Sequence, residues 1–89
     1  MEYVIDFQEI HTVAEFHDAV AAAMDLPEYY GRNLDALHDV LTELSVETRI
    51  LFLHCAVGRQ RLKSYFDWLE EMCSDVQEEN EAVILYFQE

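Results

Sequence analysis

The sequence predicts an α/β fold, a small three-stranded parallel sheet covered by three to four helices, in a single domain spanning residues 1–89. Short apolar runs at residues 3–7, 50–53 and 82–87 are typical of buried strands. Amphipathic helical patterns separate these runs, which gives the order β-α-α-β-α-β. Strands joined through helices pair in parallel with right-handed crossovers. A chain of 89 residues without linker or repeat is one domain.

The first helix is predicted after the strand at residues 3–7. Thr12 and Glu15 form a capping box, in which the threonine hydroxyl accepts from an amide and the glutamate reaches back. The helix should stop before Pro27, because the residue before a proline avoids the α region. Its inner face comprises Val13, Phe16, His17, Val20 and Met24.

A second helix is predicted after the loop at residues 26–33, with Asn33 as its N-cap. Its apolar stripe comprises Leu34, Leu37, Val40, Leu41 and Leu44. The continuous apolar run at residues 50–53 then favours a central strand covered on both faces. One long helix is expected next, with an apolar face of Leu62, Tyr65, Phe66, Leu69, Met72, Cys73 and Val76 and with Trp68 at its edge.

The charge balance indicates the class of partner. The chain contains 19 acidic residues and only five Lys and Arg, which gives a formal net charge of −14. This excess disfavours nucleic acid and anionic membranes and favours basic proteins, because opposite fields steer association. A role in solubility alone remains the alternative.

The cysteines and the N-terminus carry little further information. Cys55 and Cys73 show neither metal spacing nor a disulfide framework, and Cys73 is expected to pack as a small hydrophobe. The first residues include neither a basic segment nor a long apolar run, so we expect a cytoplasmic protein without a membrane span.

The polar face of the second helix is the candidate site. It collects Asp35, His38, Asp39, Thr42 and Glu43. Asp35 and Asp39 are neighbours at i, i+4, and no Lys or Arg of the helix relieves their repulsion. The helix dipole favours Asp35 and helps Asp39 less. An ordinary solvated acidic face is the alternative.

The loop before this helix strengthens the functional interpretation. Tyr29 and Tyr30 stand side by side, next to Gly31 and Asn33. Adjacent exposed tyrosines are typical of recognition surfaces. We expect one ring to face outward and the other to lie partly inside.

The run at residues 26–39, LPEYYGRNLDALHD, closely resembles the signature of barstar-like ribonuclease inhibitors. A weaker likeness spans nearly the whole chain, and the third helical region is the least similar. The resemblance implies a cytoplasmic immunity protein that blocks the active site of a barnase-like ribonuclease with the acidic helix and the preceding loop. The implied partner-binding residues are Tyr29, Tyr30, Gly31, Asn33, Asp35, His38, Asp39, Thr42 and Glu43.

The resemblance also implies individual roles. Tyr29 covers the mouth of the cleft, Asp39 takes the place of a substrate phosphate, and Asp35 receives hydrogen bonds from the enzyme's recognition loops. Asn33 caps the helix and contacts the enzyme, while Thr42 lies at the rim. The implied partner is a small basic ribonuclease of the secreted type, bound one-to-one, with no nucleic acid, membrane, small-molecule substrate or cofactor.

Several residues beside this site depart from the family pattern. His38 stands where Trp is common, Leu44 replaces an aromatic residue, and Glu43 replaces a small one. Arg32 adds a positive charge. These changes concern the identity of the partner, and His38 is expected to make binding pH-sensitive. Whether an acid of the last helix, Asp75 or Glu78, contacts the partner is left open.

Three other functions are alternatives to inhibition. Asp35 and Asp39 could form an acid/base pair, but the chain has no nucleophile or phosphate-loop motif, so we expect no enzymatic activity. The histidines, His11, His17, His38 and His54, are scattered, and no calcium-type loop is present, so we expect no metal site. A barstar-like immunity or binding module for a different basic toxin remains the serious alternative.

Overall fold

Three parallel strands form the sheet in a computed structural model that describes all 89 residues. They are β1 (Glu2–Asp6), β2 (Thr48–Leu53) and β3 (Val83–Phe87), in the spatial order β1-β2-β3. The central strand β2 pairs with both neighbours, and its Ile50 lies between Tyr3 and Leu85. The predicted α/β fold with a three-stranded parallel sheet is confirmed.

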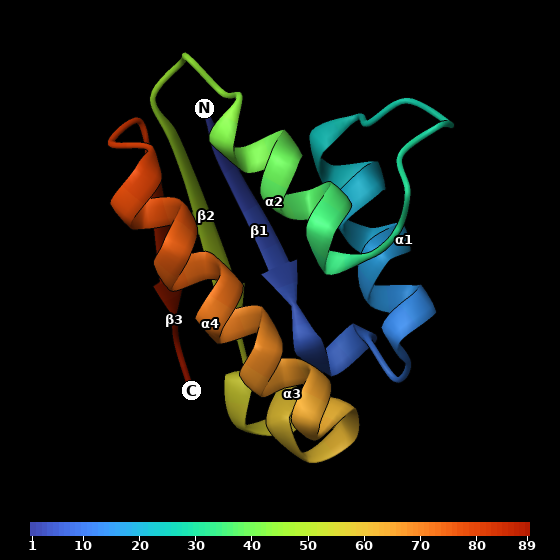
Figure 1. Cartoon of the computed structure of the whole chain (residues 1–89). Coiled ribbons are helices and arrows are strands. Elements are labelled where there is room, and N and C mark those ends of the chain that lie inside the picture. The colour runs from blue at the N-terminus through green and yellow to red at the C-terminus, as the bar shows by residue number, and fades with distance from the viewer.

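Four helices accompany the sheet, together with a short 3-10 turn (Phe7–Glu9). The helices are α1 (Val13–Met24), α2 (Leu34–Thr42), α3 (Cys55–Leu62) and α4 (Ser64–Glu79). Figure 1 shows α2 and α4 lying across one face of the sheet, with α1 beside β1 and α3 at the end of the sheet where the strands finish. None of the helices combines the length and apolar character that crossing a bilayer requires.

The core lies between this helical layer and the inner face of the sheet. Ile5, Ile50 and Leu85 point into it from the three strands, and all three are buried. Phe7 and Phe16 stack there with ring centroids 5.7 Å apart. Sulfur atoms are buried as well, since Cys55 and Cys73 are free and fully enclosed, as expected for Cys73.

The expectation that the central strand is covered on both faces is wrong. Val4 and Tyr86 flank Leu51 on the outer face of the sheet, and they remain 51% and 50% exposed. The strand order explains this, because β1, β2 and β3 succeed one another in one direction. Right-handed crossovers that advance in one direction place every connecting helix on the same face.

The expectation of one long helix before the last strand is also wrong, because this region forms two helices. Lys63, with φ of 53°, separates α3 from α4, and Leu62 therefore belongs to α3. The buried positions of α3 are Cys55, Gly58 and Leu62. Two of these three residues are small, so the segment lacks the periodic large apolar side chains that indicate an amphipathic helix.

The predicted start of α1 is confirmed with one change of partner. The Thr12 hydroxyl accepts from the Glu15 amide at 3.1 Å, as a capping box requires. The Glu15 carboxylate reaches back to the amide of His11, at 2.7 Å, one residue earlier than expected. The helix ends at Met24, before Pro27 as predicted.

Candidate partner-binding surface

The loop before α2 presents one tyrosine and buries the other. Its turn is closed by the Tyr30 amide, which donates to the Pro27 carbonyl at 3.0 Å. Tyr29 is 89% exposed, whereas Tyr30 is only 6% exposed. One ring outside and one inside is the arrangement expected from the sequence. The outer ring is therefore free to contact a partner, and the inner ring anchors the loop.

A buried histidine ties this loop to two helices. The Nδ1 atom of His17 lies 2.7 Å from the Tyr30 hydroxyl, and its Nε2 atom lies 2.6 Å from the Tyr65 hydroxyl. Burial lowers the pKa of His17, and the charge of Arg32 lowers it further. A neutral imidazole offers one donor and one acceptor, so one tyrosine donates to the ring and the other accepts from it. The histidine thus connects α1, the loop and α4.

The first turn of α2 is fixed by its cap. The Asn33 Oδ1 atom accepts from the Ala36 amide at 2.7 Å, and its Nδ2 atom donates to the Gly31 carbonyl at 3.2 Å. The preceding residue, Arg32, has a φ of 50°, and its Nε atom donates to Asp18 of α1 at 3.0 Å. The positive charge expected within the acidic patch is therefore already paired with α1.

The outer face of α2 carries exposed carboxylates. Asp35 and Asp39 are both exposed, and the Asp39 side chain keeps 78% of its surface. Glu43, exposed as well, caps the C-terminal end. The Thr42 hydroxyl donates to the His38 carbonyl within the same helix, at 2.9 Å. No Lys or Arg pairs with Asp35 or Asp39, so their charge is available to a partner.

His38 sits between acids of two helices. Its Nδ1 atom lies 3.7 Å from Asp39, and its Nε2 atom lies 3.0 Å from Glu79 of α4. Whether Asp75 or Glu78 contacts a partner stays open, and Glu79 is not identified from the sequence as a neighbour of this surface. The available signal was its position three residues after the buried Val76, which places Glu79 at the flank of the apolar stripe.

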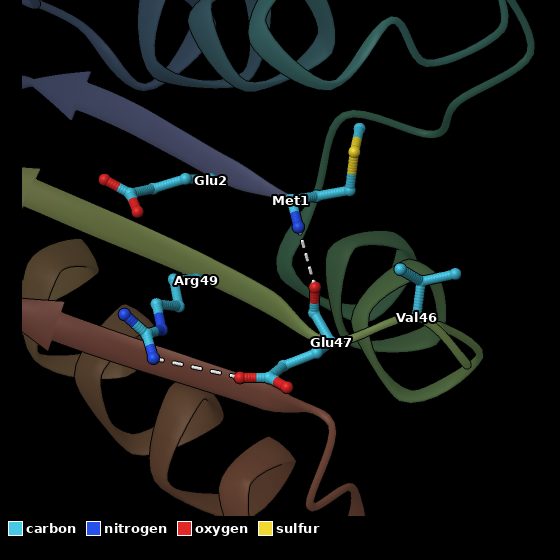
Figure 2. A pocket seen from close by; sticks show the side chains of 5 residues that line it. All are labelled: Met1, Glu2, Val46, Glu47 and Arg49. Atoms are coloured by element: carbon cyan, nitrogen blue, oxygen red, sulfur yellow. Dashed lines mark hydrogen bonds and ion pairs between the residues drawn. The ribbon is translucent and has the colours of Figure 1, made fainter.

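The exposed face of α2 does not line a pocket. The largest, of about 410 Å³, lies instead at the start of β1 and β2 and is open to solvent. Figure 2 shows its lining, with the amino group of Met1 donating to the Glu47 carbonyl at 2.9 Å and with Arg49 near the Glu47 carboxylate. No group of three or more His, Cys, Asp or Glu is placed to hold a metal ion.

These features describe a small α/β domain with an exposed acidic helix face whose Asp35 and Asp39 carboxylates have no Lys or Arg partner. Comparison with known proteins agrees. The family model described as "Barstar (barnase inhibitor)" matches residues 1–88. A Bacillus subtilis (strain 168) protein named "Putative ribonuclease inhibitor YrdF" is 34% identical over 77 residues, which cover 85% of each chain.

The chain belongs to the barstar family. Proteins of this family are inhibitors rather than enzymes, and the family supports a ribonuclease-inhibitor role for this chain.

Proposed function

We propose that this protein inhibits a barnase-like ribonuclease by filling its active site with α2 and the preceding loop. The main support is that Asp35 and Asp39 are exposed and free of Lys or Arg partners on a helix whose first turn is capped by Asn33. A ribonuclease cleft binds a polyanion and is therefore lined with cations. A preformed helix that offers carboxylates to those cations loses little conformational entropy on binding.

The proposed roles come from the family resemblance, and the exposure of Tyr29, Asp35 and Asp39 is compatible with them. Asp39 occupies the place of a substrate phosphate, Asp35 accepts hydrogen bonds from the enzyme, and the exposed Tyr29 ring covers the mouth of the cleft. Asn33 caps the helix and contacts the enzyme, and Thr42 lies at the rim. The remaining members, which support or border these contacts, are Tyr30, Gly31, His38 and Glu43. Tyr30 acts mainly from within, because its ring is buried.

The net charge supports fast association. A protein of formal charge −14 attracts a basic enzyme over distances comparable with the Debye length, about 10 Å at 0.1 M salt. Steering of this kind raises the association rate and weakens as salt is added. We propose a one-to-one complex formed in the cytoplasm of the producing cell, where rapid capture protects cellular RNA.

The test is a titration of the protein into a barnase-type ribonuclease assay at low and moderate salt. Asp39→Ala should weaken inhibition by about 2–5 kcal/mol, because enzyme cations would be buried without their partner. Asp67→Ala is the matched control, since it removes the same charge from an exposed position of α4. Equal loss in both variants would show that net charge, and not the α2 surface, is responsible.

A second candidate is an immunity or binding module for a different basic toxin. The observation in its favour is that His38, held between Asp39 and Glu79, replaces the aromatic residue of the family pattern at the centre of the surface. Folded protein that fails to inhibit barnase-type enzymes but binds a basic non-nuclease toxin through Asp39 would establish this alternative.

A further inference from the structure

The C-terminal end of α2 needs support from outside the helix. The helix has only nine residues, and isolated helices shorter than about 12–15 residues are marginal in water. Its last turn contains no basic residue, and its C-cap, Glu43, keeps a right-handed conformation. The last carbonyl groups of a helix have no partner within it. These carbonyl groups therefore take their hydrogen bonds from water or from donors elsewhere in the chain.

Asn80, at the end of α4, supplies these missing donors. Its Nδ2 atom donates to the Leu41 carbonyl at 2.9 Å and to the Leu44 carbonyl at 2.8 Å. A longer contact of 3.3 Å reaches the Thr42 carbonyl. An amide group has two N–H donors, so the two short bonds are the principal ones.

The Asn80 side chain is itself fixed in orientation. Its Oδ1 atom accepts from the Ala82 amide at 3.0 Å, and its own amide donates to the Val76 carbonyl at 2.8 Å. Because the Ala82 amide can only donate, the side-chain oxygen must face it and the nitrogen must face α2. Asn80 therefore connects the end of α4, the start of β3 and the end of α2.

Glu79, the residue before Asn80, contacts the same C-terminal half of α2. Glu79 reaches His38 at 3.0 Å, one turn before the carbonyls that Asn80 holds. Asp39 directly follows His38 in the chain, and its own carbonyl accepts from the Glu43 amide at 3.2 Å. The helix is thus held at its start by Asn33 and at its end by Asn80, with the exposed carboxylates between them.

We propose that Asn80 is a positioning residue for partner binding, which fixes the axis of α2 and hence the direction of the Asp39 carboxylate. This inference rests on the proposed function, since it concerns the same surface. Asn80 touches no partner in this role. Without it the last turn of α2 frays, and Asp39 must be ordered when the complex forms, at the expense of affinity.

The test compares Asn80→Ala with Gln77→Ala, each alone and combined with Asp39→Ala. Gln77 is the matched control, because its side-chain oxygen accepts from the Leu85 amide of β3, at 2.8 Å, and does not touch α2. Both substitutions remove hydrogen bonds between a side-chain amide at the C-terminal end of α4 and the backbone, one bond for Gln77 and several for Asn80. A purely structural role would lower stability alike in both variants and leave their inhibition constants unchanged.

We expect Asn80→Ala to raise the inhibition constant about 10-fold when Asp39 is present, and about twofold or less in the Asp39→Ala background. Gln77→Ala should leave it unchanged in both backgrounds. Most of the effect should appear in the dissociation rate. An Asn80→Ala effect that is equal in the two backgrounds, or absent, overturns the inference.

Failure of this inference is distinguishable from failure of the proposed function. Wild-type protein that does not inhibit the enzyme refutes both. Wild-type protein that inhibits while Asn80→Ala behaves like Gln77→Ala refutes only the role of Asn80. Should Asn80→Ala not fold, Asn80→Ser keeps a side-chain oxygen near the Ala82 amide but is too short to reach the α2 carbonyls, and the same outcomes apply.

Discussion

Replacement of the buried His17 by leucine should destabilise the protein and release the loop that presents Tyr29. His17 is fully buried, and both of its ring nitrogens are occupied by tyrosine hydroxyls. In His17→Leu the buried Tyr30 hydroxyl loses its partner, which costs about 1–3 kcal/mol. The Tyr65 hydroxyl is only partly buried and can turn to water, so its lost bond costs about 1 kcal/mol.

The expected loss of unfolding free energy is therefore about 2–4 kcal/mol, a large fraction of the about 5–15 kcal/mol of a typical domain. Urea denaturation followed by far-UV circular dichroism at pH 7.5 measures it. Adding Tyr30→Phe removes the orphaned hydroxyl, so the double variant should lose less than the sum of the single variants. Losses that add within about 0.5 kcal/mol would refute the proposed network.

The same residue predicts a pH dependence of stability. Since burial lowers the pKa of His17, the unfolded chain takes up a proton at a higher pH than the folded protein does. Stability rises with pH wherever the unfolded state binds more protons. Wild-type stability should therefore fall as the pH drops below about 6.5, the ordinary histidine value, and the loss should be smaller in His17→Leu. Parallel pH profiles would contradict this account.

Further outcomes concern other parts of the chain. Gly58→Ala should destabilise by about 1–3 kcal/mol in urea denaturation, despite the better helix propensity of alanine, because an added Cβ would lie 2.7 Å from the Phe7 ring; unchanged stability would contradict this packing. Burial raises the pKa of Cys55 to about 11 and of Cys73 to about 12, so both thiols should react with a thiol reagent only on unfolding, and rapid labelling of the native protein would refute their enclosure. Under the proposed function, His38→Ala should weaken ribonuclease binding by removing the contacts of the imidazole with Asp39 and Glu79, and unchanged affinity would contradict a role for these contacts.

The sequence predicted those features of the site that depend on neighbours along the chain. The Asn33 cap follows from local helix chemistry, and the pair of tyrosines predicted one exposed and one partly buried ring without deciding which of them lies inside. The polar face of α2 follows from helical periodicity, because Leu37 and Leu41 mark the opposite, buried side.

Features that depend on distant contacts could not be predicted in this way. The position of α3 depends on the small size of Gly58, because the Phe7 ring, far away in the sequence, packs against this residue. Asn80 belongs to an acidic turn that carries no sign of its bonds to α2. Glu79 contacts His38 only because α4 packs against α2. In each instance the missing information was tertiary, and no local propensity contains it.

The all-parallel sheet also governs how soon an inhibitor of this kind becomes active after synthesis. Each residue of β1 pairs with a residue of β2 about half the chain away, and β3 pairs only with β2. No strand pair can form until a long crossover has closed, which makes folding non-local and slow compared with that of a helical bundle. The α2 surface is anchored by α4 and by Asn80 at the end of α4, so it is complete only after α4 has been synthesised and has packed against α2. Under the proposed function, inhibitor that has already folded would capture a newly made enzyme sooner than inhibitor that is still being synthesised.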